Sequence, residues 1–95
     1  MLAVAEIADG VKEVAADYPV ERIELFGSYA QNRATDNSDV DLLVEFTSLA
    51  VSLLTLSSLR RDLENRLGVS VDLVHLPLPE GSFLDVGETV MLYER

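Results

Sequence analysis

Residues 23–46 read IELFGSYAQNRATDNSDVDLLVEF, and this stretch decides the fold. It begins with alternating apolar and charged residues, breaks at Gly27, and ends in an apolar run that carries acids. Alternation over four to eight residues is typical of a half-buried β-strand, and clusters of Gly, Asn, Asp and Ser are typical of turns. We therefore predict strands over residues 20–26 and 39–46, with a short helical turn at 28–32 between them.

Two helices and further strands are predicted around this stretch. An apolar period near 3.6 predicts a helix over residues 2–17, and a leucine stripe predicts another over 49–67. Residues 69–76 alternate again, and we expect a short helix at 82–87 and a last edge strand at 89–93. This order predicts an α/β (α+β) domain with a small mixed sheet of three to four strands and helices packed on one face.

The composition excludes several classes of protein. The chain has 95 residues, of which 48% are hydrophobic, so we expect one packed domain over residues 1–95 rather than disorder. It has no Cys and one His, which excludes a disulfide framework, a thiol nucleophile and a multi-His metal site. Its net charge of −10 argues against direct binding of nucleic acid, because that affinity depends on basic residues. The same acidity would also simply favour solubility.

No membrane segment is predicted. No stretch approaches the roughly 18 consecutive apolar residues that a membrane-spanning helix needs. The first residues reach an acid at Glu6 without a positively charged segment, unlike a signal peptide. We therefore expect a cytoplasmic protein that does not associate with a membrane.

Three acids are candidates for a metal site. Asp39 and Asp41 lie two positions apart, so on a strand both carboxylates project from the same face. Paired carboxylates repel each other, and Mg²⁺ is a hard cation that offsets this repulsion. Asp72 lies on the next predicted strand, and if the two strands pair, three carboxylates converge as in a two-metal site. The alternative is an edge strand with a solvated acidic face.

Gly27 and Ser28 are candidates for binding phosphate. Glycine lets a backbone approach a phosphate closely, and the start of a helix offers free N–H groups. The alternative is structural, because Ser28 and Gln31 have the spacing of a capping box. The two interpretations are compatible, since a capped turn still presents N–H groups.

The whole pattern resembles a known superfamily. Gly27–Ser28, ten further residues, Asp39-x-Asp41 and a third acid on the next strand resemble the nucleotidyltransferases typified by DNA polymerase β. Over about residues 23–76 the chain is most similar to the minimal nucleotidyltransferases, the MntA-type antitoxins encoded beside HEPN-domain ribonuclease toxins. The resemblance implies that Gly27 and Ser28 hold the outer phosphates of a nucleoside triphosphate. It also implies that Asp39, Asp41 and Asp72 ligate two Mg²⁺ ions, with Asp72 as the base.

The function implied by this resemblance is that of an enzyme. A Mg²⁺-dependent protein adenylyltransferase would transfer AMP from ATP onto a tyrosine hydroxyl of a cognate HEPN toxin, with which it would form a hetero-oligomer. Two alternatives stay open. The chain could be a weak or inactive enzyme that neutralises the toxin by stoichiometric binding, or a nucleotidyltransferase for a small molecule.

The sequence departs from the usual family pattern after the Gly-Ser pair. Relatives often continue Ala-Arg-Gly, whereas this chain has Gln31 and Asn32 after Ala30. Asn tolerates a left-handed backbone, so Asn32 can replace glycine at modest cost. Gln31 supplies no positive charge, and Arg33 is the neighbouring candidate for that role.

Other residues carry weaker predictions. Tyr29 is a candidate to flank the nucleotide, and His75 is expected to be structural. The basic residues of the predicted second long helix are expected on a solvated face or against a partner; they are Arg60, Arg61 and Arg66.

Overall fold

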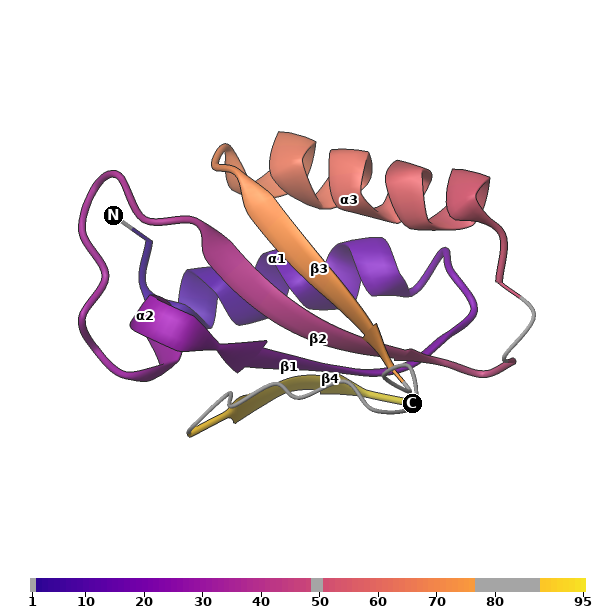
Figure 1. Ribbon diagram of the computed structural model, residues 1–95, viewed down its shortest axis with the longest axis horizontal. Coiled ribbons are helices and arrows are strands. Elements are labelled where there is room, and N and C mark those ends of the chain that lie inside the picture. Colours follow the sequence, from indigo (N-terminus) through magenta and orange to yellow (C-terminus); the bar gives the residue numbers. More distant parts are fainter. Residues whose placement is uncertain (1, 49–50, 77–87) are drawn as a thin grey trace, which may run out of the picture.

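The computed structural model describes residues 2–48, 51–76 and 88–95 (Figure 1). Its elements follow the order α1 (Val4–Ala15), β1 (Val20–Phe26), α2 (Gly27–Ala30), β2 (Val40–Phe46), α3 (Leu53–Leu67), β3 (Val71–Leu76) and β4 (Val90–Glu94). The described strands form one sheet in the order β3-β2-β1-β4. β1 is antiparallel to both β2 and β4, whereas β2 is parallel to β3.

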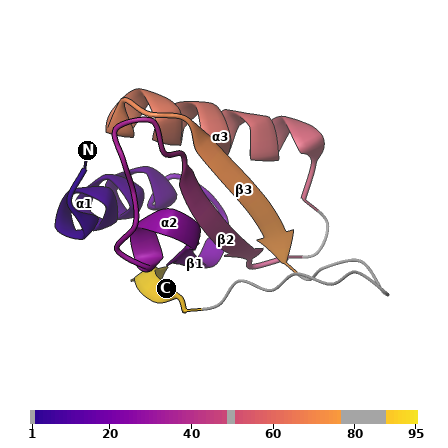
Figure 2. The same cartoon turned by 60° about the vertical axis from the view of Figure 1, so that its left-hand side comes forward.

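The helices α1 and α3 both pack on one face of this sheet (Figures 1 and 2). Alternate residues of β2 point into the resulting core, and the helices contribute apolar residues from the opposite side. These fully or almost fully buried side chains are Val40, Leu42, Val44 and Phe46 from β2, Ile7 and Val11 from α1, and Leu59 and Leu63 from α3. Burying this apolar surface is the main source of stability. No polar or charged residue is buried in the described part of the chain.

Both ends of α3 are set by local chemistry. The Ser52 hydroxyl accepts a hydrogen bond from the Thr55 N–H at 3.1 Å, which satisfies one of the free donors of the first turn. Gly68 ends the helix with a left-handed φ of +74°, and its N–H donates to the Glu64 carbonyl. The chain then returns to the sheet, so that α3 forms the crossover between the parallel strands β2 and β3.

The predicted fold class and order of elements are confirmed, with differences at the ends of elements. The first strand has its predicted bounds, but β2 begins at Val40 rather than Asp39, and α3 begins at Leu53. The predicted last edge strand is observed at Val90–Glu94. The helix expected at 82–87 lies outside the described residues. None of the helices in the described ranges has the length and apolar character needed to cross a membrane.

Candidate active site

Asp41 and Asp72 lie side by side on the face of the sheet opposite α1 and α3. The parallel register pairs Val40 with Val71 and Asp41 with Asp72, although the two acids are 31 positions apart in the sequence. Both valines are fully buried against the helices, so the alternating side chains of a strand place both carboxylates on the other face. The predicted pairing of the second and third strands is therefore present, and it brings these two acids together.

Gly27 packs directly against Asp41. It follows Phe26, which is paired with Asp41 across the antiparallel strands, and it has a φ of +75°. A Cβ atom at Gly27 would overlap Asp41 Oδ2 and lie 3.1 Å from Asp41 Cγ. Glycine is required here for two reasons: the left-handed backbone, and the space that the carboxylate occupies.

The electrostatics of Asp41 follow from its surroundings. Partial burial raises the pKa of Asp41 above its ordinary value, and the adjacent Asp72 raises it further by its charge and as a hydrogen-bond partner. The charge of Asp39 adds a smaller effect in the same direction. The ionised form of Asp41 is therefore disfavoured in the folded protein unless a cation or another donor offsets the negative charge.

Asp39 occupies a different position from the one predicted. It lies one residue before β2, is exposed, and is not one of the residues that line the neighbouring cleft. No group of three or more Asp, Glu or His side chains in the described ranges is arranged to hold a metal ion. The chemistry of the Asp41 and Asp72 pair nevertheless suits a hard divalent cation, because two facing carboxylates provide oxygen ligands whose repulsion a cation relieves.

The turn after Gly27 does not contain the predicted capping box. Phe26 is the N-cap residue of α2, and no side chain caps this helix. The side-chain amide oxygen of Gln31, Oε1, instead accepts a hydrogen bond from the Arg33 guanidinium. The structural alternative for Ser28 is therefore wrong. The prediction for Asn32 is confirmed, because this residue has a left-handed φ of 58°.

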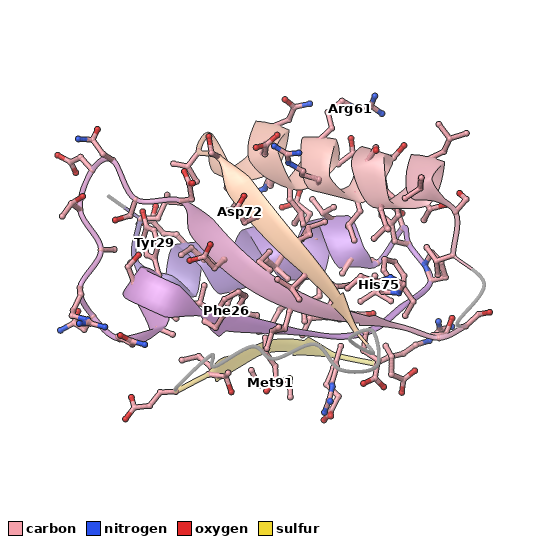
Figure 3. The ribbon with its side chains drawn as sticks, in the orientation of Figure 1. Phe26, Tyr29, Arg61, Asp72, His75 and Met91 are labelled. Atoms are coloured by element: carbon pink, nitrogen blue, oxygen red, sulfur yellow. The ribbon has the colours of Figure 1, made fainter. Side chains whose placement is uncertain are left out.

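A cleft of about 540 Å³ extends from the two carboxylates across β3 towards α3. It is lined by Phe26 of β1, Asp41 of β2, Asp72, Leu73, Val74 and His75 of β3, and Leu56, Ser57 and Arg60 of α3. Figure 3 shows Asp72 near the start of β3 and His75 further along the same strand. The volume is within the range typical of small-molecule sites.

The cleft includes two residues that the sequence analysis did not assign to it. Arg60 was expected on a solvated face or against a partner; its side chain is 57% exposed, and it also lines the cleft one helical turn after Leu56. His75 lines the cleft as well, and its ring packs edge-on against Phe46 at a centroid distance of 5.1 Å. Tyr29 belongs to the core, where it is 6% exposed, and does not line the cleft.

Comparison with known families places the chain in one group. The family profile described as "Nucleotidyltransferase domain" matches residues 7–91, which include Gly27, Ser28 and all three acids. The chain belongs to this family. The predicted resemblance is thereby confirmed at the level of the family.

Individual relatives include protein adenylyltransferases. The chain is 41% identical to a candidate protein adenylyltransferase of Methanocaldococcus jannaschii and 44% identical to the protein adenylyltransferase MntA of Thermococcus cleftensis. Each match extends over 63 residues, 66% of this chain and 63% of the relative, so the chain spans less than two thirds of their length. A crystal structure of a mutant toxin–antitoxin pair, MntA–HpeT, matches with a TM-score of 0.63 and 27% identity over 73% of this chain and 56% of that chain.

Proposed function

We propose that this nucleotidyltransferase domain transfers AMP from ATP onto a tyrosine hydroxyl of a HEPN-domain toxin and so acts as an antitoxin. The observation that carries the proposal is the pairing of Asp41 and Asp72 in adjacent positions of parallel strands, with Gly27 packed against Asp41. The name of the MntA relative and the toxin–antitoxin neighbour support the same activity and the same class of partner.

The residues have separable roles in this reaction. Gly27 and Ser28 would bind the β- and γ-phosphates of ATP at the end of β1. The acceptor oxygen would attack the α-phosphorus, the bond to the bridging oxygen of the β-phosphate would break, and pyrophosphate would leave. Asp72 would take the proton of the acceptor hydroxyl, because it lies beside the reacting centre that Asp41 defines. Positioning of this kind supplies most of the catalysis in phosphoryl and nucleotidyl transfer.

Mg²⁺ fits the donor set at this site. Asp41 and Asp72 would hold it, and Asp39 would join them from the loop before β2. Bound there, two Mg²⁺ ions would supply neutralisation of the charge on the attacking and leaving oxygens. The chain itself carries a net charge of −10, so the approach of ATP to these carboxylates needs such neutralisation.

Labelling of the partner tests the proposal. The domain is incubated with its co-purified HEPN-domain protein, Mg²⁺ and α-labelled ATP, in parallel with Asp41→Asn and with Glu45→Gln. Glu45 is the matched control, because it lies on the same strand and face but pairs with Arg22 at 3.2 Å, outside the cleft. Wild type and Glu45→Gln are expected to label a tyrosine of the partner, and Asp41→Asn is expected to lose the label. Equal labelling by Asp41→Asn would overturn the mechanism.

Stoichiometric binding is a second candidate function, and the strongly acidic charge of the chain favours it. A net charge of −10 would accelerate encounter with a basic toxin face without any catalysis. The two functions differ in the double variant Asp39→Asn with Asp41→Asn. If binding alone neutralises the toxin, this variant still protects cells. If transfer is required, protection is lost while the complex stays intact.

A further inference from the structure

Arg60 lines the cleft, and the proposed function gives it no role. It lies on α3 with a side chain that is 57% exposed, and it lines the cleft together with Asp41 and Asp72. Among the described residues that line this cleft, it is the single Lys or Arg. One cation and two carboxylates therefore line the same cleft.

The start of β3 holds Arg60 in this place. Arg60 Nε donates to the Val71 carbonyl at 3.1 Å, and the Val71 N–H donates to Glu64 Oε2 at 3.0 Å. Arg60 Nε is also 3.8 Å from Glu64 Oε2. Val71 is the first residue of a strand at the sheet edge, so its outward N–H and carbonyl are satisfied by α3 rather than by another strand. The hydrogen bond uses Nε, and the two outer nitrogens remain as donors for a ligand.

The order of the site residues across the sheet assigns a direction to the reaction. Gly27 and Ser28 follow β1, Asp41 lies on β2, Asp72 lies on β3, and Arg60 lies beyond β3 on α3. In an in-line displacement, the attacking oxygen and the leaving group lie on opposite sides of the phosphorus. If pyrophosphate leaves on the side of Gly27 and Ser28, the acceptor must arrive from the side of β3 and α3.

The lining of that side of the cleft suits an aromatic acceptor. Leu56 and Leu73 provide apolar walls, and Arg60 provides a cation beside them. A phenol ring can bury its faces against leucine, and a guanidinium stacks on an aromatic ring. A serine or threonine hydroxyl would leave the same walls exposed to water, so the lining favours tyrosine.

From these observations we infer that the part of the cleft between β3 and α3 is the acceptor subsite, and that Arg60 binds the tyrosine side chain presented by the partner protein. This inference rests on the proposed function and adds to it the side from which the acceptor enters. Arg60 contributes to affinity for the acceptor and does not contribute to binding of ATP.

Steady-state kinetics of Arg60→Gln test the inference. The Nε of glutamine is the same number of bonds from Cα as the Nε of arginine, so the donor to Val71 is kept and the outer nitrogens are removed. Arg61→Gln is the matched control, since Arg61 is the next residue, is 70% exposed, and points away from the sheet (Figure 3). AMP transfer is measured with the HEPN-domain acceptor and ATP varied separately, after thermal unfolding has shown that each variant is folded.

The KM for the acceptor protein is expected to rise about three- to thirtyfold in Arg60→Gln, the range of a partly desolvated cation–π contact. The KM of Arg60→Gln for ATP is expected to stay within about twofold of the wild-type value. In Arg61→Gln the KM for the acceptor and the KM for ATP are both expected to stay within the same range. Arg60→Lys keeps a cation that can contact an aromatic face but loses the planar guanidinium and the Nε donor to Val71, so it is expected to recover part of the loss.

Three results would overturn the inference. The first is a rise in the KM for ATP that equals the rise for the acceptor, which would make Arg60 a nucleotide-binding residue. The second is no difference between Arg60→Gln and Arg61→Gln, and the third is no recovery in Arg60→Lys. A failure of the proposed function is distinguishable from all three, because wild-type protein would then transfer no AMP to the acceptor.

Discussion

Replacing Gly27 with alanine tests the packing of the turn against Asp41. The backbone at this position is left-handed, which costs a residue with a Cβ about 1–2 kcal/mol. The new methyl group would also overlap Asp41 Oδ2, and overpacking of this kind costs about 1–3 kcal/mol. We therefore expect Gly27→Ala to lower the free energy of unfolding by about 2–5 kcal/mol. A domain of this size has a total stability of about 5–14 kcal/mol, so the loss is a large part of the total and urea unfolding establishes first that the variant is folded.

Gly68→Ala is the matched control for this substitution. Gly68 has almost the same φ, +74°, but apart from its chain neighbours no heavy atom of the described residues lies within 4 Å of the position that its Cβ would take. It should therefore lose only the backbone contribution of about 1–2 kcal/mol. The difference between the two variants isolates the contact with Asp41.

Urea unfolding followed by circular dichroism measures both variants, and AMP transfer is measured on the same samples. Displacement of a reacting group by about 1 Å costs roughly 100-fold in rate, so Gly27→Ala should lose at least that much activity, whereas Gly68→Ala should keep it. Equal stability losses in the two variants, with activity retained in both, would refute the argument that Gly27 is required by the position of the Asp41 carboxylate.

Three further predictions concern the charge of Asp41, the hydroxyl of Tyr18 and the N-cap of α3. Asp41→Asn should raise the thermal midpoint of the metal-free protein at pH 7, because the raised pKa of Asp41 means that its ionised form opposes folding. Differential scanning fluorimetry at a series of pH values measures this gain. The gain should vanish as the pH falls to 3.8, the ordinary pKa of Asp. Burial and the hydrogen bond to Asp62 raise the pKa of Tyr18 to about 12, so its stabilisation is complete below pH 10 and is lost between pH 10 and 12. Tyr18→Phe should therefore lose about 1 kcal/mol or less at pH 7 in urea titrations, and a wild type no more sensitive to alkali than this variant would contradict that assignment. Ser52→Ala should cost about 1 kcal/mol through loss of the N-cap of α3 with transfer unchanged, and an unaltered unfolding midpoint would argue against the cap.

Alternating patterns predicted the strands well because one face of each strand is buried. Val40, Leu42, Val44 and Phe46 point into the core, and this requirement leaves a period of two in the sequence. The end of an element has no such requirement. Asp39 was placed on the strand, but the ladder to β3 begins only at Val40, whose N–H donates to the carbonyl of Ser70.

The site was predicted in part. The pairing of Asp41 with Asp72 depends on which strands are neighbours in the sheet. A single sequence does not determine the neighbours, so the convergence of these acids could be predicted only on the assumption that the two strands pair. The role of Gly27 was predicted from phosphate binding, whereas its contact with Asp41 is a tertiary feature without a local signal. Arg60 is exposed as predicted, but its place at the cleft had no signal in the sequence, because it depends on the packing of α3 along β3.

The hydrogen bonds of Arg60 and Glu64 to Val71 have a consequence for local unfolding. β3 carries Asp72 but lies at the edge of the sheet, held by β2 on one side and by Arg60 and Glu64 at its start. Edge elements open at a lower free energy than the core. Release of this one strand would separate the two carboxylates while the antiparallel pair of β1 and β2 stays folded. Activity should therefore fall at denaturant concentrations that leave the core intact, and slower amide exchange in β3 would report that a ligand bridges Asp41 and Asp72.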